Sequence, residues 1–174
     1  MANPLFDLFE ASSNWNSLIK AMQFIRNNEV YVGIPQDENK RKEENEEVTN
    51  AELLFIHTNG SPVNNIPPRP VIEPSIRNDS DRLNSMMKKA AELAFNGDEQ
   101  GAVNQLKKTG MRAQNVSRAW FVNPGNGWPP NSESTIRKKK KGKKEGHEPR
   151  PLIDTGQLRK SITYFVKTKG GRTK

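Results

Sequence analysis

The residues of this sequence that could carry acid–base or metal chemistry are few and far apart. His57 and His147 are the two histidines, and the chain has no cysteine, which excludes disulfides and thiolate zinc sites. His57 has no accompanying nucleophile or carboxylate pattern. A lone histidine near a helix end is more often a packed, hydrogen-bonded residue than a base or a ligand.

Motifs of the common enzyme classes are also missing. The sequence has no phosphate-binding glycine loop, no HExxH motif, no nucleophile elbow and no metal-ligand spacing. Its paired acids fall mainly in the charged insert 36–48, which we expect to be too mobile to hold a tuned pKa. The sequence therefore predicts no enzymatic activity, no cofactor and no metal.

One arginine is presented for binding by the prolines around it. Arg69 lies between Pro68 and Pro70 in the segment 66–74, IPPRPVIEP. Prolines fix their own φ and bias the preceding residue away from helix, so we expect an extended segment at a sheet edge or crossing a surface. The guanidinium is a candidate for a paired contact with a carboxylate, either within the fold or across a subunit boundary.

A basic run near the C-terminal third is a second candidate binding element. Its members are Arg137, Lys138, Lys139, Lys140, Lys141, Lys143 and Lys144. The plain interpretation is a solvated loop. The sharper one is contact with DNA phosphates or an acidic partner, because clustered lysines release counterions without fixed geometry. No aromatic residue interleaves the run, which argues against base reading or stacking. The composition also fits a nuclear localisation signal, although nothing else in the chain indicates a nucleus.

Composition sets limits on the partners and on the core. The chain has 174 residues, a net charge of +8 and a pI near 9.8, so nucleic acid, a membrane surface or an acidic protein could bind it. Only 32% of the residues are hydrophobic and the mean hydropathy is −0.89, which is low for a compact monomer. No apolar run approaches the roughly 18 residues of a membrane span, and no signal-peptide pattern is present. We expect a protein made in a cytoplasm that completes its core on a neighbour.

The elements in the first half of the chain follow from local patterns. Residues 1–13 form a short apolar cluster that could dock on the domain or on another subunit. Asn16 or Ser17 is expected to cap a helix that ends at Asn27 and Asn28, and Val30–Ile34 is expected to be a strand. Thr49 and Glu52 form a capping box for a helix over 51–58, which Gly60 ends.

The second half is expected to supply a helical hairpin and an ordered corner. Helices over 79–96 and 99–122 are joined through Asn96-Gly97-Asp98 and should hold much of the core. In the segment 151–166, Asp154 is expected to cap a helical turn with Gln157 three residues on. That turn places Leu158 and Ile162 on one face and leads directly into a strand.

These elements predict an α+β domain with a small, mainly antiparallel sheet. Its strands are expected at 30–34, in the proline-rich segment and at 162–166, packed by the helices near 17–27 and 79–122. We predict an N-terminal arm over 1–15, one domain over 16–168 and a flexible tail over 169–174. The long charged loops of that domain are the acidic insert 36–48 and the basic loop 123–150.

Three segments in this order resemble a known family. They are AELLFIHTNGSPVNNIPPRPVIEPSI over 51–76, WPPNSESTIRKKKKGK over 128–143 and PLIDTGQLRKSI at the start of 151–166. The chain resembles the tail-completion or head-to-tail joining proteins of tailed-bacteriophage necks, also called phage virion morphogenesis proteins, over roughly 30–166. It departs from their pattern at Val71, where an aromatic residue is usual, and at Thr58 and Asn59, where an acidic and an aromatic residue are usual.

The resemblance implies a structural virion protein at the head-proximal end of the tail, synthesised in the cytoplasm of the host bacterium. It implies a closed homo-oligomeric ring of six copies with head-to-tail interfaces. Implied partners are the tail terminator and tail tube proteins, the head-completion and connector proteins, and genomic DNA in the lumen, with no membrane. The candidate assembly residues are Arg69, Pro68, Pro70, Asp154, Thr155, Gly156, Leu158 and Arg159. The alternative function is a non-specific nucleic-acid-binding module that acts through the basic run.

Overall fold

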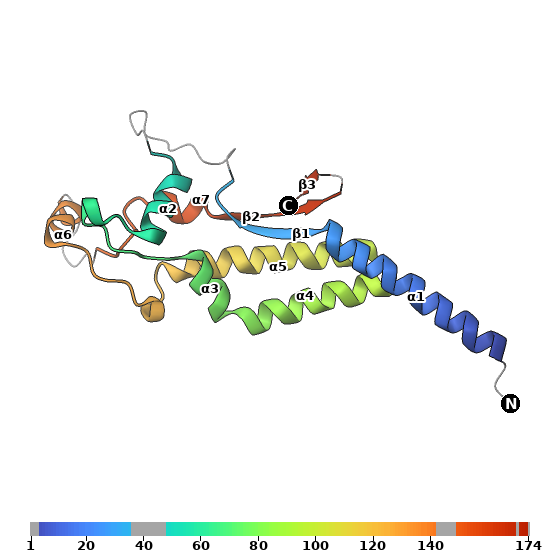
Figure 1. Ribbon diagram of the computed structural model, residues 1–174. Coiled ribbons are helices and arrows are strands. Elements are labelled where there is room, and N and C mark those ends of the chain that lie inside the picture. The colour runs from blue at the N-terminus through green and yellow to red at the C-terminus, as the bar shows by residue number, and fades with distance from the viewer. Residues whose placement is uncertain (1–3, 36–47, 142–148, 170, 174) are drawn as a thin grey trace. The chain divides into compact units, whose positions relative to one another are not determined.

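The computed structural model describes residues 4–35, 48–141, 149–169 and 171–173, with side chains from residue 15 onward. The described chain is an α+β fold, as predicted, with helices dominating and a small antiparallel sheet in the order β1-β2-β3 (Figure 1). It divides into two compact units. The first comprises residues 1–31, 80–112 and 164–174, and the second comprises residues 32–79 and 113–163.

Helices form the core of the first unit. α1 (Pro4–Asn27) packs on α4 (Ser80–Phe95), and α4 is followed by α5 (Glu99–Trp120), whose first part belongs to this unit. The predicted turn between α4 and α5 is confirmed: Gly97 has φ +82°, and the Asp98 carboxylate accepts from the amide of Gly101 at 2.8 Å. Small residues make the contacts possible, because Ala21, Ala94 and Ala102 pack together.

The sheet confirms two of the three predicted strands. β1 (Glu29–Gly33) and β2 (Thr163–Thr168) lie where the alternating residues place them, and Val166 is fully buried. The third strand is not the proline-rich segment. It is β3 (Gly171–Thr173), which pairs antiparallel with β2 so that Val166 lies opposite Thr173.

The second unit gathers short helices around one apolar cluster. The helices are α2 (Asn50–Asn59), α3 (Ile72–Asn78), α6 (Glu133–Lys140) and α7 (Gln157–Ser161), with 3-10 turns at Pro62–Asn64 and Pro124–Asn126. The cluster contains the buried residues Leu54, Val71, Trp120, Phe121, Leu158 and Ile162. Beside it, the hydroxyls of Ser75 and Ser117 lie 3.0 Å apart in the fully buried contact between α3 and α5.

Several predicted boundaries are wrong. The first helix begins at Pro4 and not at Asn16 or Ser17, so the region predicted as an N-terminal arm is largely helical. The proline-rich segment ends at Val71, because Pro74 occupies the first turn of α3, where a missing N–H costs no hydrogen bond. Part of the predicted basic loop is helical, as α6. The predicted acidic loop, apart from Val48, lies outside the described residues.

Candidate functional site

A cavity of about 960 Å³ in the second unit is the candidate functional site. It is lined by residues from four stretches of chain, 50–57, 64–69, 129–139 and 152–158. With the exception of Asn50, every lining residue belongs to one of the three segments that carry the family resemblance. Segments separated by up to a hundred residues of sequence thus form one concave surface.

The first wall is α2, whose start and end follow the sequence prediction. The Thr49 hydroxyl accepts from the Glu52 amide at 3.3 Å, and the Glu52 carboxylate accepts from the Thr49 amide at 2.8 Å. The Glu52 carboxylate also accepts from the Thr49 hydroxyl at 2.7 Å, and the hydrogen bonds that it accepts from the amide and the hydroxyl of Thr49 lower the pKa of Glu52. The helix ends at Gly60 with φ +75°, where a Cβ would lie 2.9 Å from the carbonyl oxygen of Ile66. Glycine therefore allows the following loop to fold back and carry the proline-rich segment along the cavity.

Arg69 joins the proline-rich segment to the segment that follows α5. Its Nε and Nη2 donate to the carbonyl of Pro129 at 3.1 and 3.0 Å, and Nη2 also donates to the carbonyl of Pro130 at 2.8 Å. The backbone amide of Arg69 donates to the carbonyl of His57. Only 6% of the residue is exposed, and burial lowers the pKa of its guanidinium.

The charge of Arg69 lacks a counterion in the described part of the chain. The hydrogen bonds of the guanidinium run to neutral carbonyl oxygens, and the ion pairs formed among described residues do not include Arg69. The paired carboxylate that the sequence suggested is therefore not supplied by the described residues. A buried cation with only dipolar partners is costly, so this feature bears directly on what the cavity binds.

His57 lines the same cavity beside Arg69. Its Nδ1 is buried and has no hydrogen-bond partner among the described residues. Burial lowers the pKa of His57, and the positive charges of Arg69 and Lys139 lower it further. The lowered pKa favours the neutral imidazole at pH 7. The sequence shows no catalytic partner for His57, and the position of His57 in the cavity depends on contacts between segments that are distant in sequence.

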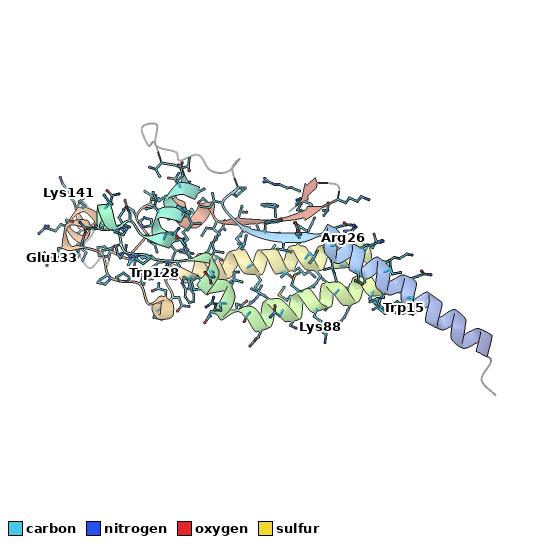
Figure 2. All side chains as sticks on the ribbon, viewed as in Figure 1. Trp15, Arg26, Lys88, Trp128, Glu133 and Lys141 are labelled. Atoms are coloured by element: carbon cyan, nitrogen blue, oxygen red, sulfur yellow. The ribbon has the colours of Figure 1, made fainter. Side chains whose placement is uncertain are left out.

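Trp128 fixes the turn that leads into the second wall. Its indole Nε1 donates to the carbonyl of Pro70 at 3.0 Å, and its ring meets Phe121 edge-on with centroids 5.8 Å apart. Figure 2 labels Trp128, and it labels Glu133 at the start of α6 and Lys141 directly after its last residue. Trp128 therefore holds the prolines that accept from Arg69 close to the apolar cluster.

The basic run begins as a helix rather than a loop. Ser132 caps α6 by accepting from the amide of Thr135 at 3.3 Å, and the cations of the last turn suit the negative end of the helix dipole. Lys139 lines the cavity and donates to the carbonyls of Arg150 and Ile153 at 2.8 and 2.6 Å. The exposed cations are Arg137, Lys138, Lys140 and Lys141. Lys143 and Lys144 lie outside the described residues.

The C-terminal corner forms the third wall, but its helix starts later than predicted. Asp154 does not cap it. Gly156 occupies the cap position with φ +77°, and the hydroxyl of Thr155 accepts from the amide of Gln157 at 3.3 Å. Asp154 thus lies two residues before the cap position. Leu158 is buried as predicted.

The structure brings together part of the predicted set of residues. Arg69, Asp154, Thr155, Gly156, Leu158 and Lys139 line the cavity. Pro68, Pro70, Arg159 and the remaining described cations of the basic run are not among its lining residues. Polar residues of the lining such as Asn131 and Ser132 are not identifiable from the sequence, because no motif distinguishes them from ordinary loop residues.

Comparisons with family models, curated proteins and solved structures found no match. Within the described residues, no helix has the length and apolarity needed to cross a membrane. No cluster of three or more histidine, aspartate or glutamate side chains that could hold a metal ion occurs in the part of the chain that the structure describes.

Proposed function

We propose that this protein is a structural subunit of a tailed-bacteriophage neck, a tail-completion or head-to-tail joining protein that assembles into a closed ring at the head-proximal end of the tail. One observation carries the proposal. The three segments that resemble the neck family line a single cavity in one compact unit. A shared surface is what a binding role requires of motifs that are far apart in sequence.

Exposed apolar side chains support assembly as the mode of action. On α1, Trp15, Ile19, Met22 and Ile25 are between 48% and 65% exposed, although they recur at helical spacing. Figure 2 labels Trp15 on this helix. Large apolar residues that stay exposed at neighbouring positions mark interaction surfaces more often than ordinary solvated surface.

Imaging tests the proposal most directly. The purified protein is examined by negative-stain electron microscopy, and its mass is measured by light scattering after size-exclusion chromatography. We expect uniform rings and a mass several times the 19.7 kDa of one chain. A monodisperse monomer at high concentration contradicts the proposal. In an infected host, deletion of residues 151–166 should give tails that fail to join heads.

A second candidate function is favoured by α6. Four exposed cations on or beside one short helix would suit a non-specific contact with DNA phosphates: Arg137, Lys138, Lys140 and Lys141. DNA affinity of the isolated protein, measured by fluorescence anisotropy over a salt series, tests it. Neutralising these four residues should abolish salt-dependent binding. Lys139 is left unchanged because its ammonium holds the carbonyls of Arg150 and Ile153.

A further inference from the structure

The cavity of the second unit contains a buried guanidinium that the described chain leaves without an anion. Arg69 is 6% exposed, lines the cavity and donates to the carbonyls of Pro129 and Pro130. Those hydrogen bonds fix the orientation of the side chain but do not neutralise its charge. An oriented, buried cation at a cavity wall is a ready-made site for an anionic group.

The charges around the cavity indicate which anion fits. Arg69 and Lys139 are cationic, Asp154 is acidic, and His57 is neutral because burial and the two cations lower its pKa. The lining therefore carries a small positive excess, which one singly charged carboxylate would balance. A doubly charged phosphate would overcompensate that excess and would be repelled by Asp154.

The size and lining of the cavity indicate that the carboxylate belongs to a larger molecule. A volume of about 960 Å³ far exceeds a lone carboxylate. Prolines, amides such as Asn64 and Asn131, and hydroxyls such as Thr155 share the wall. Such a wall suits an extended peptide, because amides and hydroxyls can pair with its backbone while the prolines contact its side chains.

We propose that the cavity binds an acidic peptide segment of a partner protein, with one carboxylate of that segment paired to Arg69. The inference rests on the proposed function in taking the partner to be another protein of the assembly. Arg69 is thus a binding residue, held by Pro129 and Pro130 for an anion that arrives from outside the described chain.

Two matched peptides test the proposal on the full chain. The probe is a short fluorescent peptide with an amidated carboxyl terminus and a single glutamate, and its match carries glutamine at the same position. Fluorescence anisotropy should show that the glutamate peptide binds about tenfold or more tightly than its match, because a hydrogen bond to a charged group is worth more than a neutral one. Equal affinity for both peptides overturns the proposal.

Variants show whether binding occurs in the cavity. Arg69→Gln should lose the preference for glutamate. Because Arg69 is buried and its loss could impair folding, Thr155→Trp provides a second test: Thr155 is exposed and lines the cavity, so the indole should obstruct entry and weaken binding about tenfold. Arg77→Gln is the control, since this exposed arginine pairs with Glu73, and it should change affinity by less than about twofold.

The remaining outcomes are equally decisive. Binding that is unchanged in both Arg69→Gln and Thr155→Trp places the peptide elsewhere and overturns the proposal. Displacement of the peptide by sodium acetate at an equal concentration would mean that a free carboxylate suffices, which overturns the assignment to a protein segment. Rings seen by microscopy without any peptide binding would leave the proposed function intact and refute this inference alone.

Discussion

Arg118 and Arg159 are linked in both directions within the second unit. The Nε of Arg159 donates to the backbone carbonyl of Arg118 at 2.8 Å, while the guanidinium of Arg118 donates to the carbonyls of Lys160 and Ile162, each at 2.8 Å. The end of α7 is thereby fixed to α5 by hydrogen bonds from charged donors, which are stronger than neutral ones. These hydrogen bonds hold the C-terminal wall of the cavity in place, and the buried Leu158 belongs to the same wall.

Replacing Arg118 should loosen this corner. Arg118→Met keeps the apolar stem but leaves the carbonyl of the fully buried Ile162 without its donor. We expect a loss of about 1–3 kcal/mol in the free energy of unfolding, measured by urea denaturation. Arg82→Met, at an exposed position on α4, is the control and should change stability by less than about 0.5 kcal/mol. Equal effects of the two variants would contradict the assignment.

The capping box of α2 should depend on pH. The folded state lowers the pKa of Glu52 through its hydrogen bonds with Thr49. The stabilisation is therefore complete above the ordinary pKa of glutamate and is lost as the pH falls through the lowered value of the folded state. The stability difference between the unchanged chain and Glu52→Gln should shrink on acidification, as followed by thermal unfolding at several pH values. Glu73→Gln, another exposed first-turn glutamate, is the matched comparison.

The features that could be predicted from sequence are those that a few neighbouring residues decide. The capping box at Thr49, the Gly97-Asp98 turn and the strand β1 are confirmed because their determinants lie within about four residues. The predicted start of α7 is wrong because Gly156, in the left-handed conformation, occupies the cap position in place of Asp154. Local propensity alone does not reveal which of two adjacent capping arrangements a turn adopts.

The cavity could not be predicted because it depends on contacts across long sequence separations. Arg69 bonds to carbonyls 60 and 61 residues away, and Lys139 closes the loop to Ile153. The flanking prolines indicated that Arg69 is held rigidly, but they carry no information on its partners. The basic run was likewise predicted to be a loop because its charges dominate the pattern, although Ser132 provides an ordinary helix cap.

His57 should make the fold sensitive to acid. Burial and the nearby cations lower its pKa, so the unfolded chain binds a proton at a higher pH than the folded chain. Stability should therefore fall as the pH drops through the ordinary range of histidine, and His57→Gln should reduce that slope. Denaturant titrations between about pH 7.5 and pH 5 measure it. An unchanged slope would show that His57 is not buried in its neutral form.

The same histidine separates a structural role from a catalytic one. His57→Ala should either weaken folding or have no effect, and it should leave ring formation intact where the variant folds. A catalytic His57 would instead show an activity that this substitution removes while assembly persists.

The exposed apolar residues of α1 should matter for assembly and not for folding. Met22 and Ile25 are 63% and 51% exposed, so Met22→Glu and Ile25→Lys should leave the circular dichroism spectrum unchanged. Both substitutions should lower the oligomeric mass measured by light scattering, because burying an unpaired charge in an interface is costly. Lys20→Glu, on the same helix, is the control for a change of charge alone. Retention of the full mass in both test variants would exclude this face from the subunit contact.

Gly110 should be required where α5 packs against Tyr164 of β2 in the first unit. A Cβ at this position would overlap the ring of Tyr164, which is 8% exposed and belongs to β2. Alanine is the better helix former by about 1 kcal/mol, so propensity alone predicts that Gly110→Ala stabilises the protein. We expect the opposite, a net loss of about 1–3 kcal/mol, because a rigid buried ring cannot yield without displacing the strand.

A double-mutant cycle distinguishes steric overlap from a backbone effect at Gly110. Tyr164→Val removes the ring that the new Cβ would meet but keeps a residue suited to a strand. In that background Gly110→Ala should cost less, and the coupling between the two changes should exceed about 0.5 kcal/mol in urea denaturation. Additive effects would show that the ring does not limit the size of residue 110, and that the glycine is retained for another reason.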